Sequence, residues 1–460
     1  MKNPHPLITS LKQLAVVAST CLAVAQAGSP VHLTAQVDRP LLLQDSTETQ
    51  SVVIKIDIKG AKQEAAATDR VPLHLAIVLD RSGSMSGAKL EQAKQAAEML
   101  VKRLAPRDLI SIVTYDTEAE VLVPARFAGH RTSETLRKIR QIEPGGSTAL
   151  YAGVKLGGAE LTGFLDDGDA SHVKRVLLLS DGLANIGPDS NREITTLGRQ
   201  LSTQGVSVTT IGLGADYNED LMVSLAEASD ANYYHVQDVE MLAGVFNDEL
   251  GELQQLVARE IRIRIICPKG VTPKRLLGRS ETFDGESSVT IPLETLASEQ
   301  HRQLFVECEV TAAVSFERLA EIEVTFNDAS DTPQTLELKD SLAVEFTQDQ
   351  SKAEAAVDQE IHIAAEIFRN AAETEKAIAL ADAGDLRAAQ AQVNSQIGHL
   401  RKLQVAASPA VAAELEEEAQ ILIENGSQLE SDGLSKTDRK ALKFNIFNRS
   451  NNRKAVPSSR

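Results

Sequence analysis

The sequence predicts an α/β fold: a doubly wound, mainly parallel sheet inserted in a β-sandwich, followed by a C-terminal helical segment. Residues 71–250 alternate short apolar runs with amphipathic helical runs, which is typical of a parallel sheet covered on both faces. The flanking stretches 28–70 and 255–347 alternate apolar and polar residues with a period of two, as half-buried strands do. Residues 351–430 are rich in Ala, Glu and Gln at helical spacing.

The central region begins with a buried strand, Leu75 to Leu79, which is too short for a helix and ends at Asp80. Apolar residues at helical spacing follow from Leu90 to Leu104, so a helix is expected after this strand. Further strands are predicted at 109–113, 121–123, 175–179, 206–212 and 233–236, and helices at 133–142, 149–163 and 191–204. The run at 121–123 follows a short turn, which indicates an antiparallel edge strand.

The N-terminal stretch 28–70 holds too few strands to be stable alone, because isolated hairpins are marginal in water. Its clearest alternation is Val52, Ile54 and Ile56 against Lys55 and Asp57. We therefore expect these strands to pair with strands of residues 255–347. That pairing makes the central α/β region an insertion in a β-sandwich.

The C-terminal segment is expected to contain three helices within 351–430, which end near residues 383, 403 and 425. Each has an apolar stripe, so packing on each other or on the sandwich is favoured over docking of a partner. Residues 431–460 form a basic tail, with eight Lys and Arg from Ser435 onward. Such a tail can touch an acidic partner or anionic lipid, but a disordered, solvated tail is the expectation.

The N-terminus has the features of a signal peptide over residues 1–27. Lys2 and Lys12 supply positive charge, the stretch from Leu14 to Ala25 is apolar, and a small-residue cleavage signal ends at Ala27. This predicts an exported protein, periplasmic or extracellular, with no transmembrane segment in the mature chain. Cleavage leaves 45 Lys and Arg against 65 Asp and Glu, a net charge of −20. That charge, with only 3% aromatic residues, argues against a nucleic-acid partner.

Two cysteines remain in the mature chain, Cys267 and Cys308. An even pair in an exported protein is compatible with a disulfide. Both also fall on the apolar side of strand-like runs, where free cysteines act as small buried hydrophobic residues. The spacing does not decide between a bridge and two buried thiols.

Oxygen-bearing side chains gather at the predicted carboxyl ends of the buried strands. Asp80, Ser82 and Ser84 follow the first strand, and alternation in an extended segment points them the same way. Open α/β sheets bind ligands at this edge. One carboxylate and two hydroxyls are hard oxygen ligands, suited to Mg²⁺ or Ca²⁺ rather than to zinc.

Two later segments complete the candidate site. Thr148 follows a glycine-rich loop, Gly145-Gly146-Ser147, and opens a helix, and Asp181 ends the strand at 175–179. Asp-x-Ser-x-Ser, a threonine loop and Asp-Gly, in this order, resemble the metal-ion-dependent adhesion site of the von Willebrand factor type A family. The alternative is a set of Ser/Gly/Asp turns and helix caps. The candidate metal ligands are Asp80, Ser82, Ser84, Thr148 and Asp181, with Mg²⁺, Ca²⁺ or Mn²⁺ as the ion.

The resemblance implies metal-dependent protein binding, with a partner supplying an Asp or Glu carboxylate. Two carboxylates only neutralise a divalent cation, so the ion keeps affinity for one more. Arg81 lies within the loop, where it either steers the acidic ligand or faces solvent. The signal peptide and flanks are similar to bacterial exported proteins labelled Ca-activated chloride channel homologues, and inter-alpha-trypsin inhibitor heavy chains resemble the chain more distantly.

The sequence supports an enzyme less well than a binding protein, and we expect no catalytic activity. The sequence has no Gly-x-Ser-x-Gly elbow, no His-Glu-x-x-His zinc motif and no phosphate-binding Gly-x-x-x-x-Gly-Lys loop. His235 is expected to be a core or edge histidine rather than a general base. A metal-dependent hydrolase remains an alternative, because an open Mg²⁺ position can activate water. A scaffold whose metal is purely structural is the other alternative.

Overall fold

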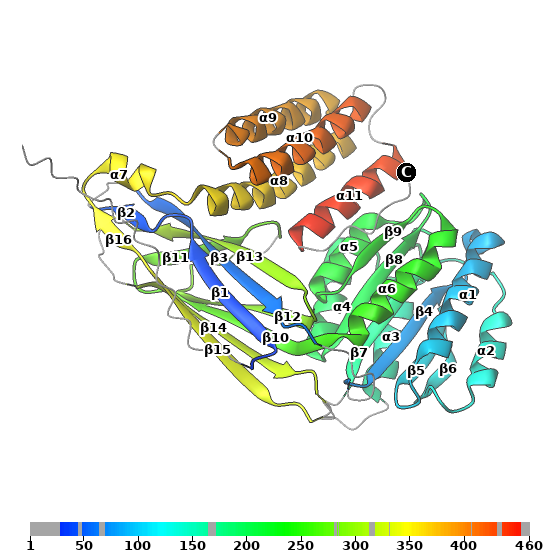
Figure 1. Cartoon of the computed structure of the whole chain (residues 1–460). Helices are drawn as coiled ribbons and strands as arrows, with labels where there is room; N and C mark the ends of the chain where they lie inside the picture. Colours follow the sequence, from blue (N-terminus) through cyan, green and yellow to red (C-terminus); the bar gives the residue numbers. More distant parts are fainter. Residues whose placement is uncertain are drawn as a thin grey trace, which may run out of the picture.

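A computed structural model describes residues 28–44, 48–63, 70–163, 172–279, 283, 285–311, 318–330, 332–405, 407–429 and 435–451. The predicted signal peptide and the last nine residues lie outside this part of the chain. Within it the fold class is confirmed: an α/β domain with a mainly parallel sheet is inserted in a β-sandwich, and helices follow (Figure 1).

The α/β domain is built on a six-stranded sheet in the order β6-β5-β4-β7-β8-β9. All neighbours pair in parallel except β6, which is the antiparallel edge strand that the sequence predicted. The strands are β4 (Leu73–Asp80), β5 (Leu109–Tyr115), β6 (Ala119–Phe127), β7 (Val173–Ser180), β8 (Val206–Leu213) and β9 (Tyr233–Val236). Strands β4, β5 and β8 are buried along their whole length, and β7 is buried at every residue except Lys174, because helices cover both faces.

Six helices surround this sheet in two layers. Helix α1 contacts both α2 and α6, and α4 contacts both α3 and α5, so the helices form two connected groups (Figure 1). Their bounds are α1 (Ala88–Arg103), α2 (Thr132–Arg140), α3 (Leu150–Gly163), α4 (Asn191–Thr203), α5 (Glu219–Ala228) and α6 (Leu242–Gln254). The sequence reading did not assign α5 or α6, although Asn218 caps α5 by accepting a hydrogen bond from the Leu221 N–H.

The sandwich contains two four-stranded antiparallel sheets, β1-β3-β13-β11 and β12-β10-β14-β15. The chain leaves it after β3 and returns at β10, and β3 pairs with β13 so that Ile54 lies opposite Val306. The predicted pairing of N-terminal with later strands is therefore confirmed. The strands are β1 (Val31–Val37), β3 (Gln50–Gly60), β10 (Leu256–Ile266), β11 (Val271–Leu276), β12 (Ser288–Ala297), β13 (His301–Val310), β14 (Arg318–Asp328) and β15 (Thr335–Ala343), with β2 (Leu41–Leu43) and β16 (Glu345–Thr347) as a separate parallel pair.

The two sandwich cysteines are unbridged, buried thiols in the core between the sheets. A hydrogen bond between them lowers the pKa of Cys267. The same contact, together with burial, raises the pKa of Cys308. The thiols thus lie next to each other, which the sequence spacing did not reveal.

The C-terminal segment holds α7 (Gln350–Ala355), α8 (Gln359–Asp382), α9 (Leu386–Gln404) and α10 (Pro409–Leu429). Helices α8, α9 and α10 contact one another around a small apolar core. Helix α8 also packs on the sandwich, where the Phe368 and Phe305 rings lie 4.6 Å apart between centroids. The apolar stripes therefore serve packing within the chain.

The basic tail is where the sequence prediction was wrong. Residues Lys436–Ser450 form helix α11, which lies between the helical segment and the α/β domain (Figure 1). Its Phe447 is 1% exposed and meets the Tyr233 ring edge-on at 5.7 Å. The prediction weighed only the positive charge of the tail and overlooked its apolar residues, which cover edge strand β9.

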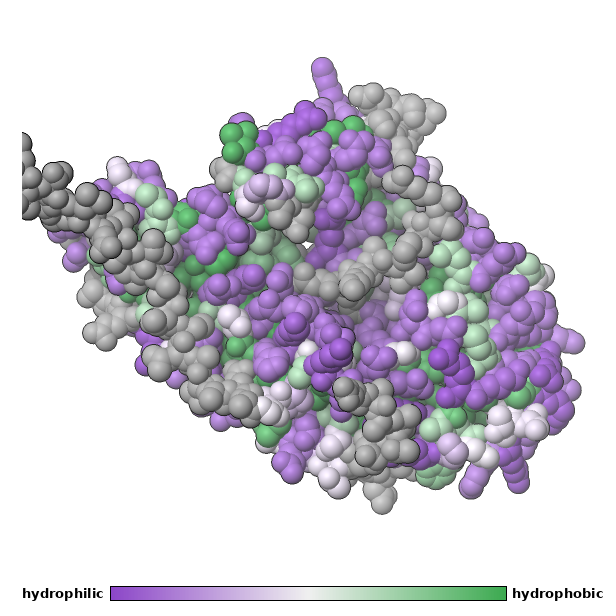
Figure 2. Space-filling model, in the orientation of Figure 1, coloured by the Kyte–Doolittle hydropathy of each residue, from purple (hydrophilic) through white to green (hydrophobic). Residues whose placement is uncertain are grey.

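Polar residues dominate the molecular face in Figure 2, on which hydrophobic residues appear only in small groups. The apolar side chains are instead gathered in the cores of the α/β domain and the sandwich. None of the helices within the described ranges is long and apolar enough to span a bilayer.

Candidate metal centre

Asp80 lies at the carboxyl end of β4, between neighbours β5 and β7, and is fully buried. One carboxylate oxygen accepts a 2.8 Å hydrogen bond from the Ser82 N–H, and the other accepts a 2.7 Å bond from the Ser180 hydroxyl. Burial raises the pKa of the carboxyl to about 6, against the opposing effect of these hydrogen bonds. The charged Asp80 carboxylate is therefore poorly solvated at this position. A cation bound next to it would stabilise the charge.

The Asp-x-Ser-x-Ser segment does not continue the strand. Ser82 precedes a 3₁₀ turn, Gly83–Met85, so the side chains are brought together by a turn instead of by extended alternation. The hydroxyls of Ser82 and Ser84 are 3.1 Å apart. Ser84 then donates a 2.7 Å hydrogen bond to Oδ1 of Asp181, which is also fully buried. The first and third segments of the motif are thus in direct contact.

Gly182 shows where the hydroxyls converge. A Cβ at this position would lie 3.2 Å from Oγ1 of Thr148, 3.3 Å from Oγ of Ser84 and 3.9 Å from Oγ of Ser82. All three hydroxyls therefore face one small space beside the backbone of residue 182. A side chain there would crowd that space, so glycine keeps it open.

Thr148 is held in place by the loop that follows Asp181. Its N–H donates to the Asn185 side-chain oxygen at 2.8 Å, and its carbonyl accepts from the Asn185 N–H at 3.2 Å. The preceding Gly146 has a φ of +66°, and a Cβ on it would overlap the Thr117 and Asp116 side chains. The glycine-rich loop can therefore close over the site only with glycine at that position.

Lys89 is a site residue that the sequence analysis missed. Its ammonium pairs with Oδ2 of Asp181, from the first turn of α1. The side chain is 32% exposed, whereas the Asp181 side chain is fully buried. The lysine lies eight residues after Arg81 and belongs to no known motif. Its place in the site therefore becomes evident only from the packing of α1 against the sheet edge. Ser180 was also missed, although it directly precedes Asp181 at the strand end.

Two other residues considered from the sequence have structural roles. Arg81 pairs with Asp116 at 3.0 Å and does not point freely into solvent. His235 hydrogen-bonds through Nδ1 to the Tyr217 hydroxyl at 2.8 Å. Burial lowers the pKa of His235 to about 4, so the imidazole is neutral near pH 7.

The five residues together offer two carboxylates and three hydroxyls. In the part of the chain that the structure describes, no group of three or more His, Cys, Asp and Glu side chains forms a metal site. All five donors are oxygens, whereas zinc and copper favour the nitrogen and sulfur of His and Cys side chains, so the donor set does not suit these metals. It suits a hard divalent cation that keeps several of its waters, as Mg²⁺ does.

Comparisons with known proteins address the same region. Residues 74–248 match the von Willebrand factor type A domain family. The protein sll0103 of Synechocystis is 24% identical over 89% of this chain and 96% of its own length. The Escherichia coli protein YfbK is 31% identical over 50% of this chain, and the match spans 39% of YfbK.

Human inter-alpha-trypsin inhibitor heavy chain H4 is 28% identical over 34% of this chain and 17% of its own length. Among solved structures, a von Willebrand factor type A protein from Catenulispora acidiphila has a TM-score of 0.69 at 16% identity. That comparison covers 95% of this chain and all of the other, so the fold is shared along nearly the whole length.

Proposed function

Because residues 74–248 form a von Willebrand factor type A domain, we propose that this protein binds a divalent cation, foremost Mg²⁺, and uses it to capture an acidic side chain of a partner protein. Ca²⁺ and Mn²⁺ are the other candidate ions. The proposed ligands are Asp80, Ser82, Ser84, Thr148 and Asp181.

The observation that carries the proposal is the convergence of three hydroxyls and two buried carboxylates at one sheet edge. When bound, the ion would supply a positive centre that accepts an oxygen ligand from outside. The carboxylates balance its charge and the hydroxyls add none, so a further carboxylate is a favourable ligand. Asp80 and Asp181 would hold the ion, and Gly182 would leave room for it.

A protein partner is favoured over a small free anion by the apolar rim of the site. Leu183 and Ile186 lie two and five residues after Asp181 and are 57% and 38% exposed. They are two of only four large hydrophobic side chains exposed in the described residues. Exposed apolar residues beside a polar centre are typical of protein interaction sites. We expect the partner to present its Asp or Glu next to apolar side chains.

We propose that the protein acts after export, in the periplasm or outside the cell, because residues 1–27 have the features of a signal peptide. We propose no catalytic activity. His235, the histidine considered as a base, hydrogen-bonds to Tyr217 and has a lowered pKa.

The test is affinity capture from the native cell envelope in Mg²⁺ and in EDTA, with Asp80→Asn alongside. Glu91→Gln is the matched control, since Glu91 is exposed on α1 and pairs with Lys94. Partners that bind to wild type and to Glu91→Gln in Mg²⁺, but neither in EDTA nor to Asp80→Asn, support the proposal. A set of partners that is indifferent to EDTA and to Asp80→Asn would contradict it.

A further inference from the structure

Lys89 brings a positive charge into the candidate metal centre. Its ammonium pairs with Oδ2 of Asp181, while Oδ1 of the same carboxylate accepts the 2.7 Å hydrogen bond from Ser84. Both oxygens of this buried group are therefore engaged. Asp80 accepts hydrogen bonds from neutral groups, and no lysine or arginine within the described residues forms an ion pair with it. One of the two carboxylates at the site is thus neutralised by the chain itself.

The place of Lys89 in α1 gives its charge no other favourable role. It is the second residue of the helix, and Gly87 at the N-cap offers no side chain to the free N–H groups. A helix N-terminus is the positive end of the helix dipole, where a cation is unfavourable. The favourable contact of the ammonium is the one with Asp181, a fully buried carboxylate that would be costly to leave without a partner.

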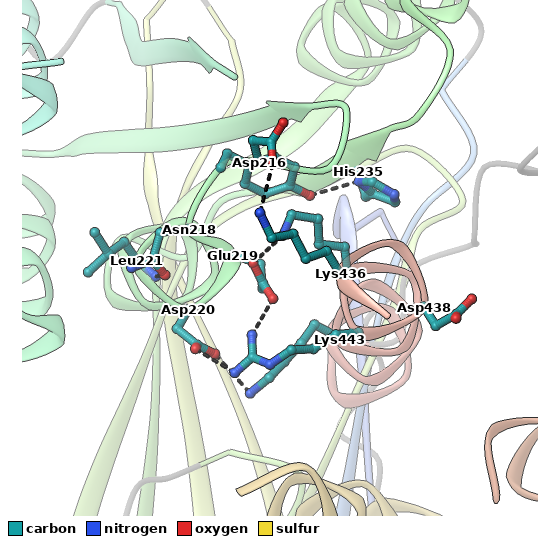
Figure 3. Close-up of polar contacts among 12 residues, drawn as sticks. Asp216, Asn218, Glu219, Asp220, Leu221, His235, Lys436, Asp438 and Lys443 are labelled. Carbon is teal, nitrogen blue, oxygen red and sulfur yellow. Dashed lines mark hydrogen bonds and ion pairs between the residues drawn. The ribbon is translucent and has the colours of Figure 1, made fainter. Parts of the chain in front are cut away.

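The lysines of α11 show a different kind of ion pair. Lys443 is 10% exposed and pairs with Asp220 at 3.0 Å, so that α11 is fixed on the first turn of α5 (Figure 3). The Lys89 side chain is 32% exposed, and the residue beside its end is a glycine, Gly214. Its ammonium can therefore leave Asp181 for water without opening an interface between helices.

We propose that Lys89 is an internal counter-ion of the metal centre: its ammonium neutralises Asp181 when no metal is bound and competes with the metal for that carboxylate. The inference rests on the proposed function, because it concerns the affinity of that same site. Ser84 can keep its hydrogen bond to Oδ1 and still offer a lone pair to the ion, since a hydroxyl both donates and accepts. Oδ2 is therefore the oxygen that Lys89 has to release.

Removal of the Lys89 charge should have two effects of opposite direction. Asp181 would be left buried without a cation beside it, so the metal-free protein becomes less stable. A positive charge that repels a divalent ion at close range would also be gone, so the metal binds more tightly. A lysine that only supports the fold would lower the stability of the protein without tightening its metal binding.

The test uses the full chain with Lys89→Gln, which removes the charge, and Lys89→Arg, which keeps it. Lys102→Gln is the matched control, because this lysine lies in the last turn of α1 and pairs with Glu98 on the same helix. Calorimetry with Mg²⁺ alone measures the affinity of each protein. Thermal unfolding in EDTA measures the stability of the metal-free protein.

We expect Lys89→Gln to tighten Mg²⁺ binding about tenfold, because a neighbouring unit charge changes the affinity of a carboxylate for a proton by about ten- to thousandfold. In EDTA the same variant should unfold about 5 °C below wild type. Lys89→Arg should bind Mg²⁺ with nearly the affinity of wild type, and Lys102→Gln should match wild type in both measurements. An affinity of Lys89→Gln that is unchanged or weaker would overturn the proposal, and so would an unchanged unfolding temperature in EDTA.

Chemical labelling of wild type follows the displacement of the ammonium directly. The rate at which acetic anhydride acetylates Lys89, measured by mass spectrometry relative to Lys102, should rise when saturating Mg²⁺ replaces EDTA. An unchanged ratio would contradict the proposal. If neither wild type nor Lys89→Gln binds Mg²⁺, the proposed function itself fails. If both bind Mg²⁺ with equal affinity, only the role of Lys89 fails.

Discussion

Oγ of Ser84 donates a 2.7 Å hydrogen bond to Oδ1 of Asp181, a residue 97 positions further along the chain. This contact ties the turn after β4 to the end of β7, neighbouring parallel strands. Polar groups from separate segments thus share one small space at the carboxyl edge of the sheet, as ligand sites of open α/β sheets do.

Asp80→Asn should abolish the stabilisation that Mg²⁺ gives to the folded protein. The variant loses one of two buried charges, and an amide is a weak ligand for Mg²⁺. For wild type, an ion at 100 times its dissociation constant adds about 2.7 kcal/mol to the free energy of unfolding. Thermal unfolding with and without Mg²⁺ measures this. Glu91→Gln should keep the full increase in unfolding temperature that Mg²⁺ gives to wild type. If Asp80→Asn also kept this increase, Asp80 would not be a metal ligand.

Phe447→Ala should lower the free energy of unfolding by about 3–5 kcal/mol, because it removes a buried ring from the interface between α11 and β9. Urea unfolding followed by circular dichroism gives the value. Val405→Ala is the control, since that side chain is 89% exposed and should change stability by less than about 0.5 kcal/mol. Equal effects of the two substitutions would mean that α11 does not dock in solution.

Glu294→Gln should change how stability depends on pH. Burial raises the pKa of Glu294, on β12, from 4.5 to about 7, while a hydrogen bond from Ser202 opposes the shift. The folded protein then holds a proton that the unfolded chain releases near pH 4.5. Glu294 therefore makes its full contribution to the free energy of unfolding below pH 4.5, and this contribution declines as the pH rises towards 7.

Glutamine carries no titrating proton, so the variant should lack this decline. When the pH rises from 5 to 8, the free energy of unfolding of the variant should increase by about 2–3 kcal/mol relative to that of wild type. Urea midpoints at the two pH values measure the difference. Parallel pH profiles for the two proteins would show that Glu294 titrates normally in the fold.

Cys267 and Cys308 should form a disulfide when the folded protein is oxidised, because their thiols are hydrogen-bonded to each other. The bridge would close a loop of about 40 residues and stabilise the fold by roughly 4 kcal/mol on chain-entropy grounds. Mass spectrometry of unreduced peptides detects the bridge, and the melting temperature with and without dithiothreitol reports its effect. Two alkylatable thiols after oxidation would contradict this expectation.

The parts of the fold that the sequence predicted well depend on local patterns. Asp80 and Asp181 end continuous apolar runs, which are unmistakable in a parallel sheet buried on both faces. The alternation at Val52 to Ile56 likewise showed that the N-terminal strands need partners. Because these signals lie within a few neighbouring residues, one chain was enough to find them.

The parts that the sequence did not predict depend on tertiary contacts. Lys89 reaches Asp181 only because α1 packs over the sheet edge, and no spacing rule links the two residues. The many basic residues of α11 led to the prediction of a disordered tail, in spite of its apolar residues. In the fold these charges pair with acidic residues more than 200 positions away, such as Glu219. Short range patterns carry no information about such pairings.

The most direct test of the proposed metal site is a crystal of the protein soaked in Mn²⁺, whose anomalous scattering marks the ion. We expect one strong anomalous peak beside Gly182, about 2.0–2.3 Å from oxygens of the Ser82, Ser84 and Thr148 side chains or their bridging waters, with Lys89 displaced from Asp181. At saturating Mn²⁺, a site without a peak and with Lys89 still paired to Asp181 would contradict the proposal that this type A domain is a metal-dependent binding module.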